Sequence, residues 1–173
     1  MSNLRAVFFV VLLTIIDQAT KLAAINYLRP AGSIPLIPEI FHLTYATNAG
    51  AAFGMFQGAR WFFVILTVVV LSVMAYYYVK LPHTREYAWV RFCLILICGG
   101  ALGNFIDRLL KGYVVDFLHV TFIRFPIFNF ADIFLVVGTF LLAIIMLFVI
   151  KDEFPAPSEN ITDPEALRNT TRR

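Results

Sequence analysis

The chain has 173 residues, which is enough for one domain. Hydrophobic residues make up 60% of it and charged residues only 14%, whereas a soluble domain carries about 45–50% apolar and about 25% charged residues. The net charge is +3 at pH 7, but many basic residues flank apolar runs instead of forming a basic stripe. The composition therefore argues against an ordinary soluble domain and against nucleic-acid binding.

The apolar residues gather in four long runs, at residues 6–25, 61–79, 92–110 and 133–150. Each run approaches the roughly 20 residues that a helix needs to cross a bilayer. Unpaired backbone groups are costly in lipid, so each run is predicted to be a transmembrane helix. The start resembles a secretory signal, but only Leu22-Ala23-Ala24 imitates a cleavage site, and we expect an uncleaved first helix.

Basic residues prefer the cytoplasmic side of a membrane. With both termini inside, that side receives eight of the fourteen basic residues: Arg5, Lys80, Arg85, Arg91, Lys151, Arg168, Arg172 and Arg173. This orientation predicts a transmembrane domain over residues 1–150 and a polar, flexible cytoplasmic tail over residues 151–173. Residues 80–91 are expected to be a short polar connector on the inner side.

Two outer segments follow from this topology, at residues 27–60 and 112–130. Pro30, Pro35 and Pro38 argue against a continuous helix at the start of the first segment. Residues 40–45 and 114–120 are β-prone, so short strands are expected there. Both segments are rich in aromatic residues and are expected to lie on the outer membrane surface. The predicted fold is an all-α membrane protein with four transmembrane helices, a small extracytoplasmic β-containing segment and a surface-lying outer loop.

Polar residues gather near the outer ends of the predicted helices. Burying an ionisable group in a membrane costs free energy, so such residues suggest a structural or functional role. Asp17 and Lys21 are four apart with the acid first, which favours an ion pair. That pair either lets the helix insert as a neutral unit, or it leaves Lys21 to contact a neighbouring acid or a substrate backbone. Asp107 is expected to pair with Lys111 at the same spacing.

The third predicted helix carries further polar groups at its outer end. Asn104 and Arg108 share one face, and Arg108 could hold the outer segments through their carbonyls or carboxylates. The glycines between Gly99 and Gly103 have a spacing that is typical of closely packed helices.

Asp116 and Asp132 give the sharpest functional hypothesis. Hydrolysis of an amide needs a base to activate water and an acid to protonate the leaving nitrogen, and two adjacent carboxyls that share one proton serve both roles. Sixteen residues separate them, and a reversing outer segment could bring them together. The alternative is two acids at helix ends that face water, with Asp132 a favourable charge near the start of the fourth helix.

Other kinds of site find little support. His119 lies three residues after Asp116, but no HExxH motif or paired Cys/His spacing accompanies it, so no metal or other cofactor is expected. His42 and His83 are isolated in the sequence, which favours surface roles. Cys93 and Cys98 cannot easily form a disulfide on one helix. The chain also lacks the elbow of a serine hydrolase and the Lys-Ser/Thr ending of a phosphate loop.

The sequence resembles the lipoprotein signal peptidases, also called signal peptidase II, over residues 6–150. The matching motifs are Asp17-Gln18-Ala19-Thr20-Lys21, Asn48-Ala49-Gly50-Ala51-Ala52-Phe53-Gly54, Gly99 to Arg108, Val114-Val115-Asp116-Phe117 and Phe128-Asn129-Phe130-Ala131-Asp132. Their order and spacing resemble those of the family, although residues 117–131 form a shorter segment than is typical of it.

The resemblance implies that Asp116 and Asp132 are a catalytic dyad. It implies a supporting or substrate-binding role for Asp17, Lys21, Asn48, Gly50, Asn104, Arg108 and Asn129. The implied substrate is a prolipoprotein whose cysteine carries a diacylglyceryl group, cut just before that cysteine at the outer face of the bacterial inner membrane. Membrane lipid and globomycin-type cyclic peptide inhibitors are further implied partners, and the family suggests a monomer.

Two other functions compete with this interpretation. A small transporter or channel is expected to carry polar residues throughout the bilayer depth. The inner halves of the last three predicted helices are instead nearly all apolar. A membrane scaffold without enzymatic activity would tolerate the loss of Asp116 or Asp132.

Overall fold

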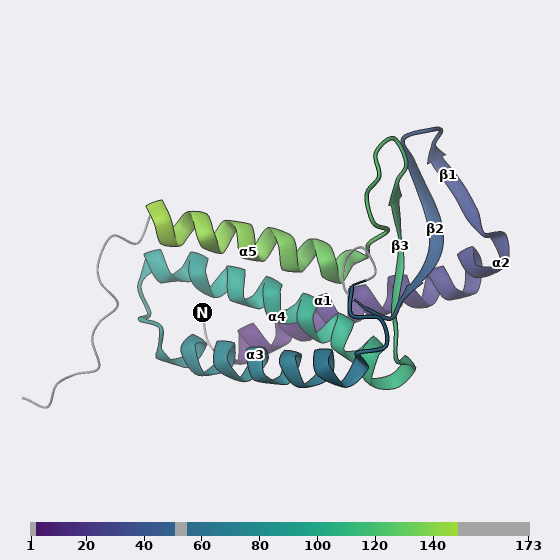
Figure 1. The fold of residues 1–173 in the computed structure, drawn as a ribbon. Helices are drawn as coiled ribbons and strands as arrows, with labels where there is room; N and C mark the ends of the chain where they lie inside the picture. The colour runs from purple at the N-terminus through teal and green to yellow at the C-terminus, as the bar shows by residue number, and fades with distance from the viewer. Residues whose placement is uncertain (1–2, 51–54, 149–173) are drawn as a thin grey trace, which may run out of the picture.

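The computed structural model describes residues 3–50 and 55–148. Residues 51–54 of the small-residue motif and the predicted tail at 151–173 lie outside the described residues. In the described part, four helical segments are long and apolar enough to cross a membrane: Asn3–Ala31, Arg60–Lys80, Tyr87–Lys111 and Phe130–Phe148. They form one bundle, and a small sheet stands at one end of it (Figure 1). The four-helix prediction is confirmed.

The first helical segment runs further than the sequence predicted. It comprises α1 (Asn3–Ala23), the π-helical turn η1 (Ala24–Leu28) and α2 (Arg29–Ala31). Pro30 was expected to exclude a helix here, yet it lies in the first turn of α2. A proline is tolerated at that position because the amide hydrogen it lacks is not needed for the first turn. The chain then leaves the helix at Gly32, whose φ of 75° suits glycine.

The connector between the second and third spans is shorter than the predicted residues 80–91. α3 (Arg60–Lys80) is separated from α4 (Arg85–Lys111) by residues 81–84 alone. The polar residues from Arg85 to Arg91 therefore form the first turns of α4. Arg91 is buried, and its guanidinium donates to the carbonyl of Leu81 at 2.6 Å, which closes the turn. Buried Leu81, Tyr87 and Leu94 form an apolar cluster at this end.

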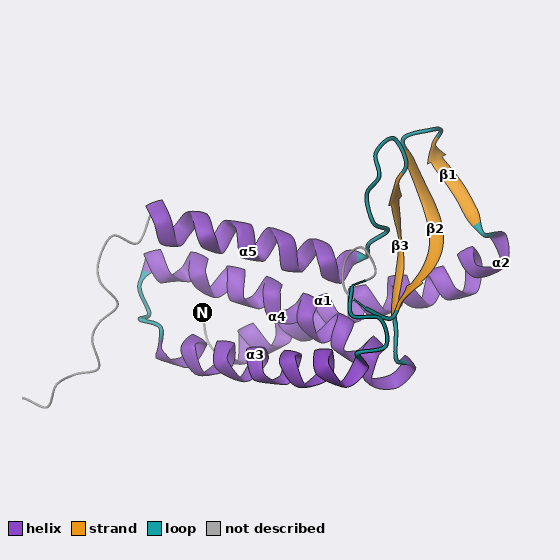
Figure 2. Cartoon of the chain, viewed as in Figure 1, coloured by secondary structure: helices purple, strands orange, loops and turns teal. Residues whose placement is uncertain are grey.

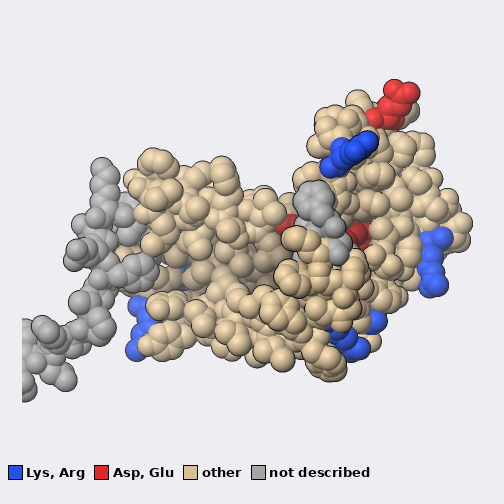
Figure 3. All heavy atoms as spheres, in the orientation of Figure 1, with Lys and Arg blue, Asp and Glu red and all other residues tan. Residues whose placement is uncertain are grey.

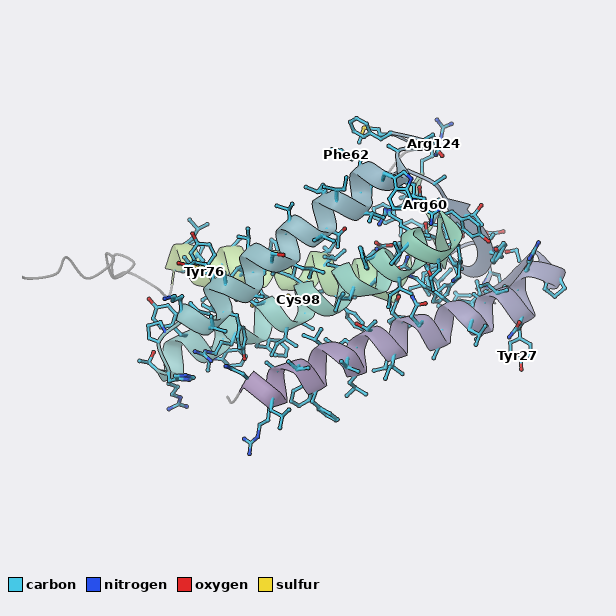
Figure 4. All side chains as sticks on the ribbon, turned by 90° about the horizontal axis from the view of Figure 1, so that it is seen from below. Tyr27, Arg60, Phe62, Tyr76, Cys98 and Arg124 are labelled. Atoms are coloured by element: carbon cyan, nitrogen blue, oxygen red, sulfur yellow. The ribbon has the colours of Figure 1, made fainter. Side chains whose placement is uncertain are left out.

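Glycines allow α4 to pack closely against α1 and α5 (Phe130–Phe148). A Cβ atom on Gly103 would lie 2.4 Å from Asp17 Oδ2, and one on Gly100 would lie 2.4 Å from the carbonyl oxygen of Ala131. The close packing expected between Gly99 and Gly103 is thus confirmed. Figure 4 shows α4 in the middle of the bundle, with Cys98 labelled on it. Cys93 and Cys98 are free thiols.

Three strands form an antiparallel sheet in the order β1 (Ser33–Ile37), β2 (Phe41–Asn48) and β3 (Val114–Val120) (Figure 2). The two predicted strands are confirmed as β2 and β3. β1 was not predicted; Pro35, which was expected to argue against a helix here, lies within this strand. It is accommodated on the edge of the sheet, where one side of the strand needs no hydrogen-bond donors.

The sheet packs on the end of the first helical segment. Ala24 and Leu28 of η1 are buried against Val115, Phe117 and Leu118 of β3. The strands run across the direction of the helices (Figure 2). In a membrane spanned by the helices the sheet would therefore lie along the surface. We call this end of the molecule the sheet end.

Candidate active site

The buried charged groups lie almost entirely where the bundle meets the sheet. Asp17, Lys21, Asp107 and Asp116 are each 3% exposed or less. On the face shown in Figure 3, the middle of the bundle carries no exposed charge, and acidic atoms show in a recess beside the sheet. Among the residues that the structure describes, Arg91 is the buried charge at the opposite end.

Lys21 is the centre of a buried ionic network. Its ammonium contacts Asp17 Oδ2 at 2.8 Å, Asp107 Oδ2 at 3.2 Å and Asn104 Oδ1 at 2.8 Å. These three acceptors use the three N–H donors of an ammonium group. Asp107 Oδ1 also binds Lys111 Nζ at 2.7 Å. Both predicted ion pairs are confirmed, and Lys21 is fully enclosed by neighbouring side chains.

The start of α5 is held by a reciprocal pair of hydrogen bonds. The backbone N–H of Asp132 donates to Asn129 Oδ1 at 3.0 Å, and the backbone N–H of Asn129 donates to Asp132 Oδ2 at 3.1 Å. This is the arrangement of a capping box. The next free amide, Ala131 N–H, donates to Asp17 Oδ1 at 2.9 Å. α1 therefore fixes the position of the α5 terminus.

Asn129 and Asn104 connect the two aspartates. Asn129 Nδ2 donates to Asp116 Oδ1 at 2.6 Å, and Asn104 Nδ2 donates to Asp132 Oδ1 at 2.8 Å. Asn129 thus touches both carboxyls, one through its side chain and one through its backbone. Asp132 lies at the start of α5, as expected if it were only a favourable charge at a helix end. Its Oδ1 atom, however, also accepts a hydrogen bond from Asn104 on α4.

Asp116 is a strongly perturbed carboxyl. It is 3% exposed, and burial together with the negative charge of Asp132 raises its pKa from 3.8 to about 7, against the opposing hydrogen bond from Asn129. Such a carboxyl holds its proton near neutral pH. The alternative of two acids that face water therefore does not fit Asp116.

Arg108 and Asn48 join the loop after β2 to this pair. Arg108 donates to the carbonyl oxygen of Gly50 at 3.2 Å, and its guanidinium lies 4.7 Å from the ring centre of Phe63. It also attracts Asp132 and Asp116 electrostatically. Asn48 Oδ1 accepts from the backbone of Gly50 at 3.0 Å, and the Asn48 side chain hydrogen bonds to Asp116. All nine residues expected at the site lie in this one connected region.

Sequence reasoning missed two supports of the site. Gln18 Nε2 donates to the carbonyl oxygen of Gly103 at 3.0 Å, which ties α1 to α4. Asp107 Oδ2 accepts the backbone N–H of Val115 at 3.1 Å, which holds the strand that carries Asp116. The sequence offered a partner for Asp107 only on its own helix, so the contact with β3 could not be foreseen.

The histidines lie away from the carboxyl pair. The sequence suggested that His42 is isolated, but in the structure it lies opposite His119 in the register of β2 and β3, with ring centres 6.3 Å apart. His119 Nδ1 contacts Thr44 Oγ1 at 3.2 Å. Within residues 3–50 and 55–148, no three His, Cys, Asp or Glu side chains lie close enough together to hold a metal ion.

Comparisons with known proteins agree with one another. The family model described as signal peptidase (SPase) II matches residues 9–148. A lipoprotein signal peptidase of Caldanaerobacter subterraneus subsp. tengcongensis is 48% identical over 144 residues, which cover 83% of this chain and 96% of that protein. A lipoprotein signal peptidase of Streptococcus pyogenes is 43% identical, over 80% of this chain and 90% of that protein.

Solved structures show the same fold. One, described as a bacterial membrane enzyme structure obtained by the in meso method at 2.3 Å resolution, aligns with a TM-score of 0.77 and 33% identity, over 88% of this chain and 95% of that one. Another, described in the same way at 1.9 Å resolution, has a TM-score of 0.75 and 34% identity, over 86% of this chain and 96% of that one.

Proposed function

This chain belongs to the signal peptidase (SPase) II family, and from that membership we propose that it is an aspartic endopeptidase of the membrane. Its substrate would be a prolipoprotein whose cysteine carries a diacylglyceryl group, and the cut would fall just before that cysteine. The observation that carries this proposal is the pair Asp116 and Asp132, which Asn129 contacts together at the sheet end of the bundle.

The pair suits general acid–base hydrolysis of a peptide bond. One carboxylate removes a proton from water as the water oxygen attacks the scissile carbonyl carbon, and the other carboxyl protonates the carbonyl oxygen. The raised pKa of Asp116 supports a single proton on the pair at neutral pH. Arg108, which attracts both aspartates, balances the one remaining negative charge.

The location of the pair suits a substrate that is held in lipid. Asp116 lies on β3 and Asp132 in the first turn of α5, at the level where the helices end and the sheet begins. A substrate anchored by acyl chains and a signal helix would present its cleavage site at this level. Exposed apolar side chains such as Val136 and Phe140 of α5 offer surface for that anchor. An extended substrate segment could be held by the short strands.

We further propose the bacterial inner membrane, with both termini cytoplasmic and the sheet end outside. Arg5 and Lys80 lie toward the opposite end of the bundle, as the preference of basic residues for the cytoplasm requires. Residues 151–173 would be a separate cytoplasmic tail. The carboxyl pair supplies both acid and base, so we expect that no cofactor is needed. From the family we also expect a monomer and inhibition by globomycin-type cyclic peptides.

A defined cleavage assay tests the substrate. The purified protein is incubated with one prolipoprotein in two forms, with and without the diacylglyceryl group. Cleavage of the modified form alone is expected, and mass spectrometry should place the new terminus at the lipidated cysteine. Equal cleavage of both forms would refute the substrate class, and cleavage of neither would favour the scaffold function.

A further inference from the structure

Lys21 of α1 makes the shorter of the two hydrogen bonds that orient the Asn104 side chain. Lys21 is an ammonium group and can only donate, so the Asn104 atom that faces it at 2.8 Å is the amide oxygen. The Asn104 amide nitrogen therefore points the other way and donates to Asp132 Oδ1 at 2.8 Å. Lys21 is fully buried, and Asn104 is the side chain that connects it to Asp132. Asn129 Nδ2 donates to the same Asn104 oxygen at the longer distance of 3.2 Å, so it supports the orientation that Lys21 sets.

Asn129 is oriented by the same logic. The backbone N–H of Asp132 can only donate, so the Asn129 atom that it binds at 3.0 Å is the amide oxygen. Asp132 consequently receives a donor on each oxygen, from Asn104 Nδ2 on Oδ1 and from the Asn129 backbone on Oδ2. Hydrogen bonds donated to both oxygens favour the charged form of a carboxyl.

Other features place the negative charge on the same residue. Asp132 lies in the first turn of α5, where the helix dipole favours an anion. It is also half-buried, whereas Asp116 is 3% exposed, so a charge on Asp116 loses more solvation. The raised pKa of Asp116 agrees with this division.

We propose that Lys21 is a positioning residue that, through Asn104, keeps Asp132 as the ionised member of the pair and leaves the shared proton on Asp116. This inference rests on the proposed peptidase function and deepens it by assigning the base and the acid. Lys21 contacts neither aspartate of the pair. Its charge also acts on Asp116 through space and lowers the pKa of that carboxyl, against the larger opposing effects of burial and of Asp132.

The assignment sets the course of the reaction. Asp132 takes a proton from water as the water oxygen bonds to the carbonyl carbon, and Asp116 gives its proton to the carbonyl oxygen. The product is a neutral tetrahedral diol, with Asp132 protonated and Asp116 ionised. Asp132 then protonates the amide nitrogen as the C–N bond breaks, and Asp116 takes a proton from one diol hydroxyl. The acid and amine products leave, and both aspartates regain their starting states.

The test compares Lys21→Met, the double variant Asp17→Asn/Lys21→Met, and the wild type. The double variant removes both charges of the pair and keeps an oxygen to accept the Ala131 N–H, so it provides a folded reference if Lys21→Met alone does not fold. We expect kcat to fall about 100-fold, as when one preorganised donor is removed, with KM unchanged. The acid limb of the kcat/KM profile should also move to higher pH, because the ionised form of the pair loses a fixed hydrogen-bond donor.

Lys111→Met is the matched control. It removes the same positive charge and an ion pair with the same carboxyl, Asp107, but it does not touch Asn104. The other charged groups around the pair, Arg108 and Asp107 on α4, stay unchanged. We expect the control to keep the wild-type pH profile.

A folded double variant with the wild-type kcat and pH profile would overturn the role of Lys21, as would an equal shift in Lys111→Met. Asp116→Asn and Asp132→Asn are assayed in parallel to separate the two proposals. If both lose cleavage while the Lys21 variants behave as wild type, the inference fails and the proposed function stands. If either cleaves normally, the proposed function itself fails.

Discussion

Replacing Gly103 by alanine tests whether the contact of α1 with α4 positions the proposed catalytic pair, Asp116 and Asp132. The added Cβ would lie 2.4 Å from Asp17 Oδ2 and 2.9 Å from its Cγ atom, so one of two things must yield. Separation of the helices would cost about 1–3 kcal/mol, as in other overpacked cores. Rotation of Asp17 would instead leave the Ala131 N–H without its acceptor, at about 1.5–3 kcal/mol for a hydrogen bond to a charged group.

The cheaper of these two routes sets the outcome, so we expect a loss of about 2 kcal/mol in the free energy of unfolding. Both routes also shift the start of α5, which carries Asp132. A displacement of about 1 Å at a reacting group can cost about 100-fold in rate. We therefore expect a large fall in kcat in addition to the loss of stability.

Gly138→Ala is the matched control for this experiment. Its Cβ would meet Ile97 Cγ1 at 2.8 Å and the carbonyl oxygen of Cys93 at 3.1 Å. This contact joins α5 to α4 and leaves α1 untouched, and it lies farther along α5 than Asp132. Both variants are measured by thermal unfolding in the same detergent and by cleavage kinetics corrected for folded protein. Equal kcat values in the two variants would contradict the positioning role of the Asp17 contact.

Four more predictions follow from the contacts described above. Because the acid must be protonated and the Asp116 pKa is about 7, kcat should fall as the pH rises through about 7, and a rate that stays level to pH 9 would contradict this. The same raised pKa means that Asp116 holds a proton more tightly in the folded state than in the unfolded state. The free energy of unfolding should therefore fall by about 4 kcal/mol as the pH rises from about 4 to about 7. Asp116→Asn should abolish this pH dependence when unfolding is measured across that range. Asn129→Ala removes the donor on Asp116 and the capping oxygen for Asp132, and should lower kcat at least 100-fold with a smaller loss of about 1 kcal/mol in stability. Arg91→Leu removes the hydrogen bond to Leu81 at the opposite end, and should lower the melting temperature while the kcat of the folded protein stays at the wild-type value.

Local sequence patterns predicted those parts of the site in which both partners lie on one element. The spacing of four residues gave the pairs Asp17 with Lys21 and Asp107 with Lys111, and both exist. The β-prone composition of residues 40–45 and 114–120 likewise indicated β2 and β3. The capping box of Asn129 and Asp132 has a readable signature too, since an N-cap residue and an acid lie three apart before an apolar run.

Contacts between distant segments could not be predicted in the same way. Lys21 reaches Asn104 across 83 residues, and Asp17 reaches Ala131 across 114 residues. No spacing rule relates such positions, because the packing of α1 against α4 decides them. The error at Pro30 has a related cause, because this proline occupies a first helical turn, where its missing N–H is not needed. β1 was not predicted, and its Pro35 is tolerated because the strand lies on the edge of the sheet.

The most direct measurement of the central claim is single-turnover cleavage of a diacylglyceryl-modified prolipoprotein by purified Asp116→Asn and Asp132→Asn. Each replacement keeps the shape of the side chain and removes one titratable oxygen. We predict that both variants fold and bind the lipidated substrate with the wild-type affinity, but that neither produces detectable cleavage on the timescale of the wild-type reaction. Normal turnover by either folded variant would show that the two carboxyls do not form the catalytic pair.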